Sequence, residues 1–336
     1  MKTPNIFNYA TSELSQDAFI CWLLAWSDPT HANEDKDLHL VANHFVKSLF
    51  EKHQIELDAV ETIKIKPQDQ YIDVGAIVND QYYLLIEDKT VTRNHSNQLN
   101  KYYQYAFKKY VDTGKLKNII PIYLKTHDQC DMDYVREHNG FEPYLRKDFL
   151  GVLNGYGGNN CIMLAFKSYL QSIEDNVNAF STRPLVAWRA EQWIGFFQAL
   201  KNEFPAGQWK YVPNPSGGFY GFWWAERKTD EPCPIKLQVE GTAAKKQQPS
   251  IGKLCFKIKA IEDTLRKKLR SQWRHELERK FENSGFSVVK PQRFGNGKFM
   301  TAAILQDDFR VAKPDGTLDF DATVASLKKI EEIYAL

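Results

Sequence analysis

The sequence predicts an α/β fold in its N-terminal half and an α+β domain in its C-terminal half. In the first half, helical periodicity and apolar strand-like runs follow one another in the order helix, helix, three strands, helix, strand. In the second half, several short strands lie between helical segments, which is typical of an antiparallel sheet. The stretch STRP at 181–184 separates two helical patterns with a proline, so we expect one domain over 1–180 and another over 185–336.

The elements of the first half follow from periodicity and from start and stop signals. Ser12 is a candidate N-cap for a first helix. The polar tripeptide 79–81 lies between two apolar runs, as a hairpin turn does, and Gly114 ends a helix before the last strand. A weaker stretch over 128–160 contains the loop-like NGYGGNN. The expected elements are a helix from Glu13, a helix over 34–53, strands over 60–65, 71–78 and 82–87, a helix over 96–110, a strand over 118–124 and a helix over 161–178.

The second half alternates helical and strand-like patterns without any repeat. Its helices are expected over 188–204, 262–284 and 321–334. Its strands are expected over 209–212, 219–227, 235–240, 253–260, 286–290 and 298–305.

Composition excludes several classes of protein. With 43% hydrophobic and 26% charged residues in 336, the chain is globular, and its net charge of +2 requires any nucleic-acid surface to be local. The five cysteines are scattered without a C-x-x-C pair, which argues against a zinc site or a disulfide framework. The N-terminus lacks a signal-peptide pattern, and FICWLLAW is far shorter than the roughly 20 residues that span a bilayer. We therefore expect a cytoplasmic protein that does not contact a membrane.

Charged residues interrupt two apolar runs in YIDVGAIVNDQYYLLIEDKT (71–90). If these runs pair through a turn centred near residue 80, Asp73 and Glu87 lie almost opposite each other. Side chains alternate along a strand, so Lys89 points the same way as Glu87, and Asp88 points the other way. Two neighbouring carboxylates repel unless a cation lies between them. Lys89 supplies one positive charge, and the arrangement favours a hard divalent ion, Mg²⁺ or Mn²⁺.

These residues resemble the signature of the PD-(D/E)XK nuclease superfamily, which has an acidic residue on one strand and (D/E)-x-K at the end of the next. The stretch QLNKY at 98–102 resembles the Q-x-x-x-Y motif of the RecB and λ-exonuclease branch, and Glu13 matches an acidic residue in the first helix. The superfamily's restriction-endonuclease-like core, α-β-β-β-α-β with a mixed sheet, has the order expected here. The resemblance covers about 5–175. In one departure, Ile72 precedes Asp73 where the signature has proline.

The resemblance implies a Mg²⁺- or Mn²⁺-dependent nuclease that hydrolyses phosphodiester bonds, with DNA as the expected substrate and a defence or repair system as the setting. The implied metal ligands are Glu13, Asp73, Glu87 and, through its backbone carbonyl, Asp88. Lys89 would position the attacking water and stabilise charge on the phosphate, Gln98 would orient the site, and Tyr102 would support its helix. The alternative is a catalytically silent module of the same fold that binds nucleic acid or a protein partner.

Several simpler explanations stay open at this point. The charges could be solvated strand ends, Asp69 could replace Asp73 as a ligand, and Glu13 could merely favour a helix N-terminus. The basic run at 266–280 could track phosphates or form a solvated helix face, and the aromatic run at 218–227 could stack bases or fill a core. The role of the C-terminal domain is open, with nucleic acid, a ligand, a protein partner or an oligomer contact as candidates.

Overall fold

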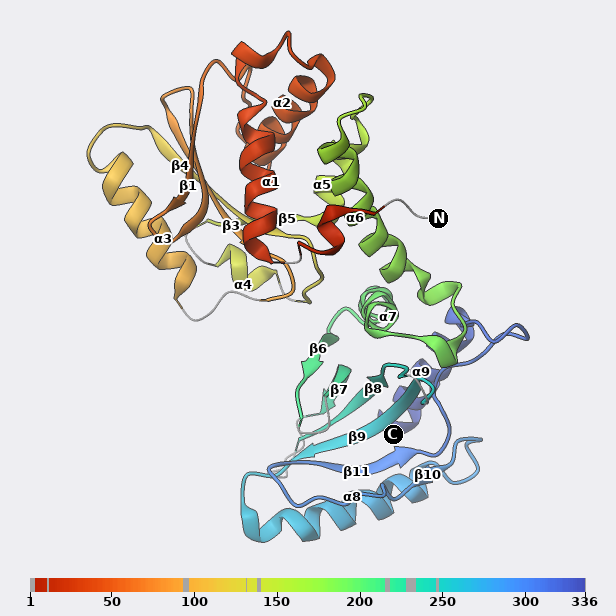
Figure 1. Ribbon diagram of the computed structural model, residues 1–336. Helices are drawn as coiled ribbons and strands as arrows, with labels where there is room; N and C mark the ends of the chain where they lie inside the picture. The colour runs from red at the N-terminus through yellow and green to blue at the C-terminus, as the bar shows by residue number, and fades with distance from the viewer. Residues whose placement is uncertain are drawn as a thin grey trace. The chain divides into compact units, whose positions relative to one another are not determined.

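The computed structural model describes residues 4–10, 12–92, 97–130, 132–137, 140–214, 218–227, 234–245 and 248–335. The chain divides into two compact units, Met1–Glu174 and Asp175–Leu336, and passes from one to the other inside a long helix (Figure 1). None of the helices in the described ranges has the length and apolar character needed to cross a bilayer.

The first unit contains one five-stranded sheet, which is mixed as the sequence predicts but has one strand more than expected. The strand order is β1-β2-β3-β4-β5, with β1, β2 and β3 antiparallel and β3, β4 and β5 parallel. Its strands are β1 (Ile63–Asp69), β2 (Ile72–Val78), β3 (Tyr82–Lys89), β4 (Asn118–Lys125) and β5 (Glu142–Leu145). Its helices are α1 (Glu13–Ala25), α2 (Lys36–Glu51), α3 (Gln98–Ala106), α4 (Asp133–Arg136), α5 (Arg146–Asn154) and α6 (Cys161–Asn178).

Helices cover both faces of this sheet (Figure 1). Side chains of one face, among them Val74 of β2 and Ile86 of β3, form a core with α1, α2, α5 and α6. The other face packs against α3 and the π-helical turn Phe107–Val111 that continues it, with Tyr83 stacked on Tyr110 at 4.3 Å. The central strands β2, β3 and β4 are thus buried on both faces, which is why their sequences read as nearly continuous apolar runs.

Two parts of the first unit differ from the sequence expectation. β1 begins three residues later than expected. It also includes Pro67, Gln68 and Asp69, which fall between the expected strands 60–65 and 71–78. β1 is an edge strand, where proline is tolerated because one side of the backbone has no ladder partner. The stretch 128–160 contains α4, β5 and α5, which the sequence left unassigned because β5 has only four residues and includes a proline.

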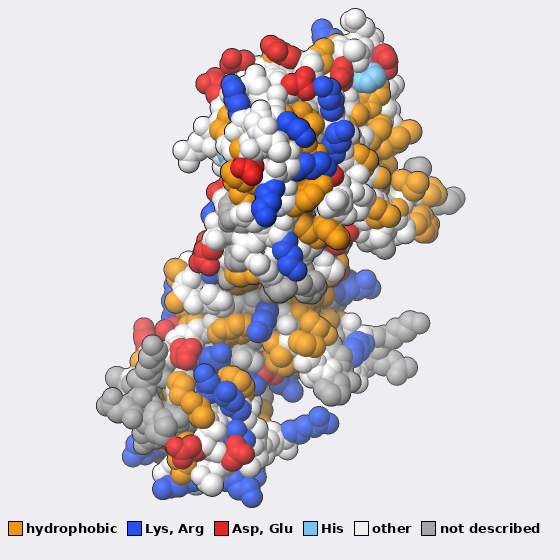
Figure 2. Space-filling model, turned by 90° about the vertical axis from the view of Figure 1, so that its left-hand side faces the viewer, with side chains coloured by type: hydrophobic (Ala, Val, Ile, Leu, Met, Phe, Trp, Pro, Cys, Tyr) orange, Lys and Arg blue, Asp and Glu red, His pale blue; other side chains and the backbone are white. Residues whose placement is uncertain are grey.

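The second unit contains a six-stranded antiparallel sheet of order β10-β11-β9-β8-β7-β6, which confirms the predicted α+β class. The strands are β6 (Gln208–Val212), β7 (Phe219–Arg227), β8 (Ile235–Thr242), β9 (Ile251–Lys259), β10 (Val288–Val289) and β11 (Phe299–Leu305). The helices are α7 (Ala190–Glu203), α8 (Arg266–Lys280) and α9 (Phe320–Ala335). On the surface drawn in Figure 2, lysines and arginines are interspersed with hydrophobic side chains and separate acidic groups, in line with the near-neutral total charge.

Candidate active site

The hairpin of β2 and β3 has the register that the sequence predicts. Val74 pairs with Ile86 and Val78 with Tyr82, so the hairpin is centred on Asp80. Asn79 and Asp80 have φ of 54° and 49°, and Asn and Asp tolerate this left-handed conformation better than other non-glycine residues do. The turn thereby fixes which side chains meet at the far end of the hairpin.

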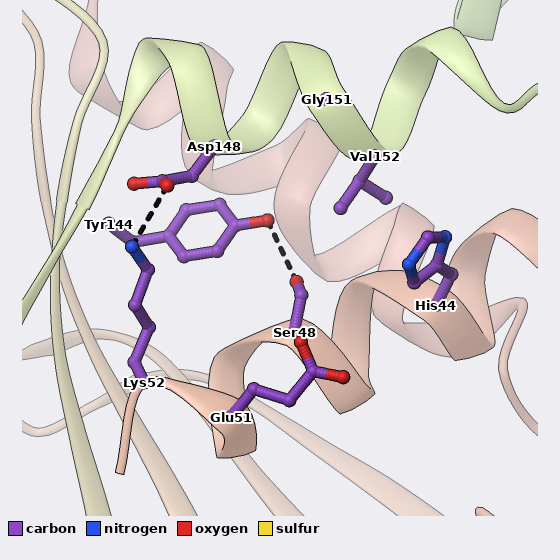
Figure 3. Close-up of a pocket in the computed structure, with 8 residues that line it drawn as sticks. All are labelled: His44, Ser48, Glu51, Lys52, Tyr144, Asp148, Gly151 and Val152. Atoms are coloured by element: carbon purple, nitrogen blue, oxygen red, sulfur yellow. Dashed lines mark hydrogen bonds and ion pairs between the residues drawn. The ribbon is translucent and has the colours of Figure 1, made fainter. Parts of the chain in front are cut away.

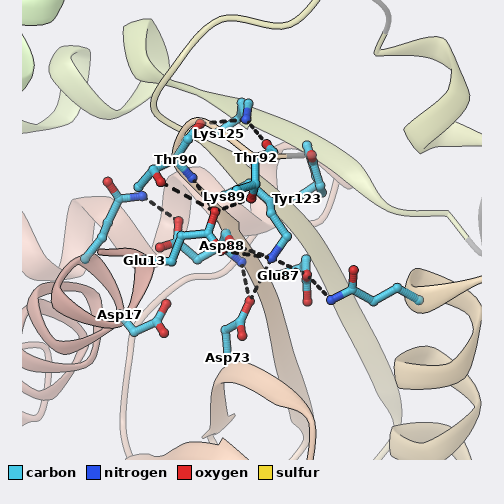
Figure 4. Close-up of polar contacts among 12 residues, drawn as sticks. Glu13, Asp17, Asp73, Glu87, Asp88, Lys89, Thr90, Thr92, Tyr123 and Lys125 are labelled. Carbon is cyan, nitrogen blue, oxygen red and sulfur yellow. Dashed lines mark hydrogen bonds and ion pairs between the residues drawn. The ribbon is translucent and has the colours of Figure 1, made fainter. Parts of the chain in front are cut away.

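At that end, four oxygen groups surround the ammonium group of Lys89 (Figure 4). Lys89 Nζ lies 2.6 Å from Glu87 Oε1 and donates a 2.8 Å hydrogen bond to the backbone oxygen of Asp88. It lies 3.5 Å from Asp73 Oδ2 and 3.6 Å from Glu13 Oε2. Asp73 Oδ2 also accepts a 3.1 Å hydrogen bond from the backbone N–H of Asp88. The residues proposed from the sequence therefore converge on one point.

The centre of this cluster is buried, whereas Asp73 and Glu13 at its edge are 23% and 29% exposed. The Glu87 side chain is 0% exposed and that of Lys89 is 8% exposed. Burial and the charge of Asp73 raise the pKa of Glu87 to about 8, although Lys89 opposes that shift. Burial alone would lower the pKa of Lys89, but the carboxylates of Glu87, Asp73 and Glu13 raise it. Lys89 is thus held as a cation among acidic groups.

Glu13 reaches the cluster from the first turn of α1. Its Oε1 accepts hydrogen bonds from the backbone N–H of Thr90 at 3.1 Å and from the Thr92 hydroxyl at 2.5 Å. Burial would raise the pKa of Glu13, but the Thr92 hydrogen bond and the charge of Lys89 lower it. The carboxylate therefore points across to the end of β3, which argues against the simpler explanation that Glu13 only favours a helix N-terminus.

Gln98 and Tyr102 join the cluster from α3, on the other face of the sheet. Gln98 Nε2 donates to Glu87 Oε1 at 2.7 Å and lies 2.9 Å from the Tyr102 hydroxyl. The two residues are four apart in a helix and so share one face. Gln98 thus holds the same carboxylate oxygen that Lys89 contacts, and Tyr102 holds Gln98.

The structure adds residues that the sequence analysis did not select. As expected, the Asp88 side chain points away from Lys89, and there its Oδ1 accepts a 2.5 Å hydrogen bond from Gln16 of α1. Burial and the nearby charge of Asp73 raise the pKa of Asp17 to about 6. Gln16 and Asp17 follow Glu13 by three and four positions, so helical spacing could have placed all three on one face.

A second buried lysine supports the segment after β3. Lys125, which is 1% exposed at the end of β4, donates to the backbone oxygen of Thr90 at 2.6 Å and also bonds to that of Thr92. Because β3 and β4 are parallel, Lys89 pairs with Lys125 and both strands end at the same edge. The similar strand endings EDKT (87–90) and YLKT (123–126) could have suggested from the sequence that the two lysines lie at one edge.

A family comparison agrees with this geometry. The family model described as PD-(D/E)XK nuclease superfamily matches residues 4–178. The chain belongs to the PD-(D/E)XK nuclease superfamily. The match covers α1 to α6, and it includes every residue of the cluster. Searches of curated proteins and of solved structures found no match to the chain.

Members of the PD-(D/E)XK nuclease superfamily use divalent metal ions, and the oxygen groups around Lys89 suit such an ion chemically. In the described ranges, no three His, Cys, Asp or Glu side chains form a ready metal-binding group. The Lys89 ammonium lies among the carboxylates of this cluster. Of the carboxylates that contact Lys89, Glu87 has a buried oxygen, Oε2, without a hydrogen-bond partner. Hard carboxylate and carbonyl oxygens are the ligands that Mg²⁺ and Mn²⁺ prefer.

Asp69, the alternative to Asp73, belongs to a different cluster. Its carboxylate accepts hydrogen bonds from Lys109 at 2.7 Å, Tyr110 at 2.8 Å and Tyr83 at 3.1 Å. Tyr105 of α3 donates a further hydrogen bond at 3.2 Å, so the cluster attaches β1 to α3 and to its π-helical continuation. Asp73, and not Asp69, is the residue that contacts Lys89.

A separate pocket of about 370 Å³ lies between α2 and α5 (Figure 3). Within it, Ser48 bonds to the Tyr144 hydroxyl at 2.8 Å and Lys52 pairs with Asp148 at 2.9 Å. None of its lining residues comes from α1, β2 or β3, so it is distinct from the carboxylate cluster. These four polar side chains pair with one another, and the pocket contributes nothing to the candidate site.

Proposed function

We propose that this chain is a Mg²⁺- or Mn²⁺-dependent nuclease that hydrolyses phosphodiester bonds in DNA. The convergence of Glu13, Asp73 and Glu87 on one point beside Lys89 carries the proposal. Carboxylates are concentrated in a buried place only at a large cost in desolvation and repulsion, so a silent binding module has little reason to keep them. This favours an enzyme over the silent alternative.

The residues divide into those that hold a cation and those that act on the phosphate. The metal-holding groups are Glu13, Asp73, Glu87 and the backbone carbonyl of Asp88. A bound divalent ion lowers the pKa of water and stabilises charge on a phosphoryl oxygen. Lys89 then orients the attacking water and offers a positive charge to the phosphate as negative charge builds up in the transition state.

Gln98 and Tyr102 act as positioning residues in this proposal. Gln98 donates to Glu87 Oε1 and limits the rotation of that carboxylate, and Tyr102 restrains Gln98. A defence or repair setting and a cytoplasmic location belong to the same proposal. The four described cysteines are free thiols.

The deciding experiment is cleavage of supercoiled and linear plasmid with Mg²⁺, Mn²⁺ or EDTA. Glu87→Gln and Lys89→Met are expected to lower the cleavage rate at least about 100-fold, because each removes a charge from the reacting centre. The matched control is Lys64→Met, which removes a lysine that pairs with Asp80 on the solvated side of the hairpin. It should cleave at the wild-type rate.

Each outcome has one meaning. Metal-dependent cleavage that both site variants lose supports the enzyme, and nicking of the circle identifies an endonuclease. Attack on the linear form alone identifies an exonuclease. Cleavage that persists in folded Glu87→Gln contradicts the proposed site. A folded chain that cuts neither substrate with either metal supports the silent binding module.

A further inference from the structure

The six-stranded sheet of the second unit has two faces of different character. One face is apolar and carries the helices. Trp193 of α7 lies against Gly241 of β8, and Phe197 of α7 lies 5.8 Å from Phe222 of β7. Phe281, which caps α8, contacts Phe256 of β9 at 5.3 Å. The alternation of β7 thus buries Phe222 and Trp224, as the simpler explanation of the aromatic run expected.

The opposite face carries lysines and aromatic rings. The register aligns Lys210 with Gly221, Glu240 and Lys253, and it aligns Lys236 with Lys257 and Thr301. We call this face the lysine face. Its members include Lys210, Trp223, Lys236, Gln238, Glu240, Lys253, Lys257, Lys259, Phe299 and Thr301. Glu240 accepts a 2.9 Å hydrogen bond from Gln238, and Lys257 donates one to Thr301 at 2.8 Å.

Positive charge dominates the lysine face. Glu240 pairs with Lys257 at 2.6 Å, so Glu240 neutralises the charge of only a part of the lysines on this face. Burial lowers the pKa of Lys236, and Lys210, Lys257 and Lys259 lower it further, although Glu226 opposes the shift. The lysines are therefore close enough to repel one another, a cost to folding that a bound polyanion would offset.

Aromatic rings lie among these charges. The half-buried Trp223 has Lys236 Nζ at 5.0 Å and Lys210 Nζ at 5.6 Å from its ring. Phe299 is 65% exposed and lies 5.9 Å from Lys259 Nζ. Rings flanked by cations offer a stacking surface for bases together with charges for the adjacent phosphates. Bases inside a duplex are already stacked on one another, so bases that stack on these rings must come from a single strand.

We propose that the lysine face binds single-stranded DNA, with Trp223 and Phe299 stacking bases and the surrounding lysines contacting phosphates. The preference for DNA over RNA rests on the proposed function, whereas the choice of face rests on the sheet itself. Helix α8, the other basic element, is a weaker candidate because Arg274 pairs with Glu278 and Lys280 pairs with Glu276.

The test is fluorescence anisotropy of the full chain with a labelled mixed-sequence 20-nucleotide DNA strand, in EDTA and over a range of salt. Lys210→Gln/Lys236→Gln should weaken binding and lower the salt slope by about 1.4, since each phosphate contact on a single strand contributes ~0.7. Trp223→Leu should weaken binding about 5-fold to 100-fold through lost stacking. The matched control, Lys267→Gln/Lys268→Gln, removes two exposed lysines from α8 and should bind as wild type.

Circular dichroism of each variant checks the fold, and if Trp223→Leu does not fold, the exposed Phe299→Ala replaces it. Any of three results would overturn the proposal. The lysine-face variants could keep their affinity, or the α8 control could lose as much affinity as they do. The chain could also bind duplex DNA, or RNA of the same sequence, more tightly than the single DNA strand. EDTA separates binding from cleavage. A chain that binds through this face and cuts nothing contradicts only the proposed nuclease, whereas a chain that cuts but binds independently of this face contradicts only this inference.

Discussion

At the scale of single residues, the protonation of Glu87 should control metal binding. Burial and the charge of Asp73 raise the pKa of Glu87 to about 8, so below that pH a metal ion must displace a proton. Mn²⁺ affinity should therefore rise with pH between 6 and 8, by at most about tenfold per unit for one displaced proton, and then level off. Titration calorimetry in two buffers of different ionisation enthalpy measures both the affinity and the proton released.

Two variants test this prediction. Asp80→Asn changes an exposed carboxylate at the tip of the same hairpin and should keep the wild-type pH profile. Glu87→Gln cannot bind or release the proton, so any remaining Mn²⁺ binding should lose its dependence on pH in this range. Affinity that is flat between pH 6 and 8 in the wild-type chain would show that Glu87 does not hold the proton.

At the scale of elements, the Asp69 cluster should determine how firmly α3 is attached to the sheet. The carboxylate accepts hydrogen bonds from Lys109, Tyr110 and Tyr83, so Asp69→Asn leaves donors without a charged acceptor. Loss of such hydrogen bonds should lower the free energy of unfolding by about 2 kcal/mol, measured by urea denaturation. Because α3 carries Gln98, the rate of cleavage should also fall, although Asp69 lies outside the carboxylate cluster.

The pH dependence of that stability has a definite sign. Burial would raise the pKa of Asp69, but the hydrogen bonds from Lys109 and Tyr110 lower it. The contribution of Asp69 is therefore present above the ordinary carboxyl pKa and disappears as the pH falls through the lowered value. Wild type and Asp69→Asn should begin to converge in stability as the pH falls below about 4, and they should coincide only below the lowered pKa of Asp69. The surface variant Asp80→Asn should cost less than about 1 kcal/mol at any pH.

The sequence predicts those elements and site residues whose positions depend on local pattern. The β2–β3 hairpin is symmetrical about residue 80, so alternation alone brings Asp73 to Glu87 and Lys89, and helical spacing joins Gln98 to Tyr102. Helical spacing from Glu13 and the similar strand endings EDKT and YLKT were signals for Gln16, Asp17 and Lys125, but the contacts of these residues depend on how α1 and β4 pack against β3. For the same reason β5 was missed, since four residues gain strand structure only by pairing with β4.

At the scale of the whole molecule, each unit has its own sheet and its own apolar core, so we expect two unfolding events rather than one. Scanning calorimetry of the full chain should resolve two transitions. Mn²⁺ should raise the midpoint of the transition that belongs to the first unit, because a ligand that binds only the folded state stabilises it by mass action. The transition of the second unit should not move.

Core variants assign the two transitions. Ile86 in the first unit and Leu237 in the second are both fully buried. Ile86→Val and Leu237→Ala should each lower the unfolding midpoint of their own unit alone. Leu237→Ala should lower the free energy of unfolding by about 2–5 kcal/mol. Glu87→Gln should abolish the shift with Mn²⁺ while leaving two transitions. A single transition that Mn²⁺ and both core variants move together would show that the units unfold as one body. DNA bound at the lysine face would then stabilise the whole chain, and so would Mn²⁺ bound at the carboxylate cluster. The two binding effects on the unfolding midpoint would have to be analysed together.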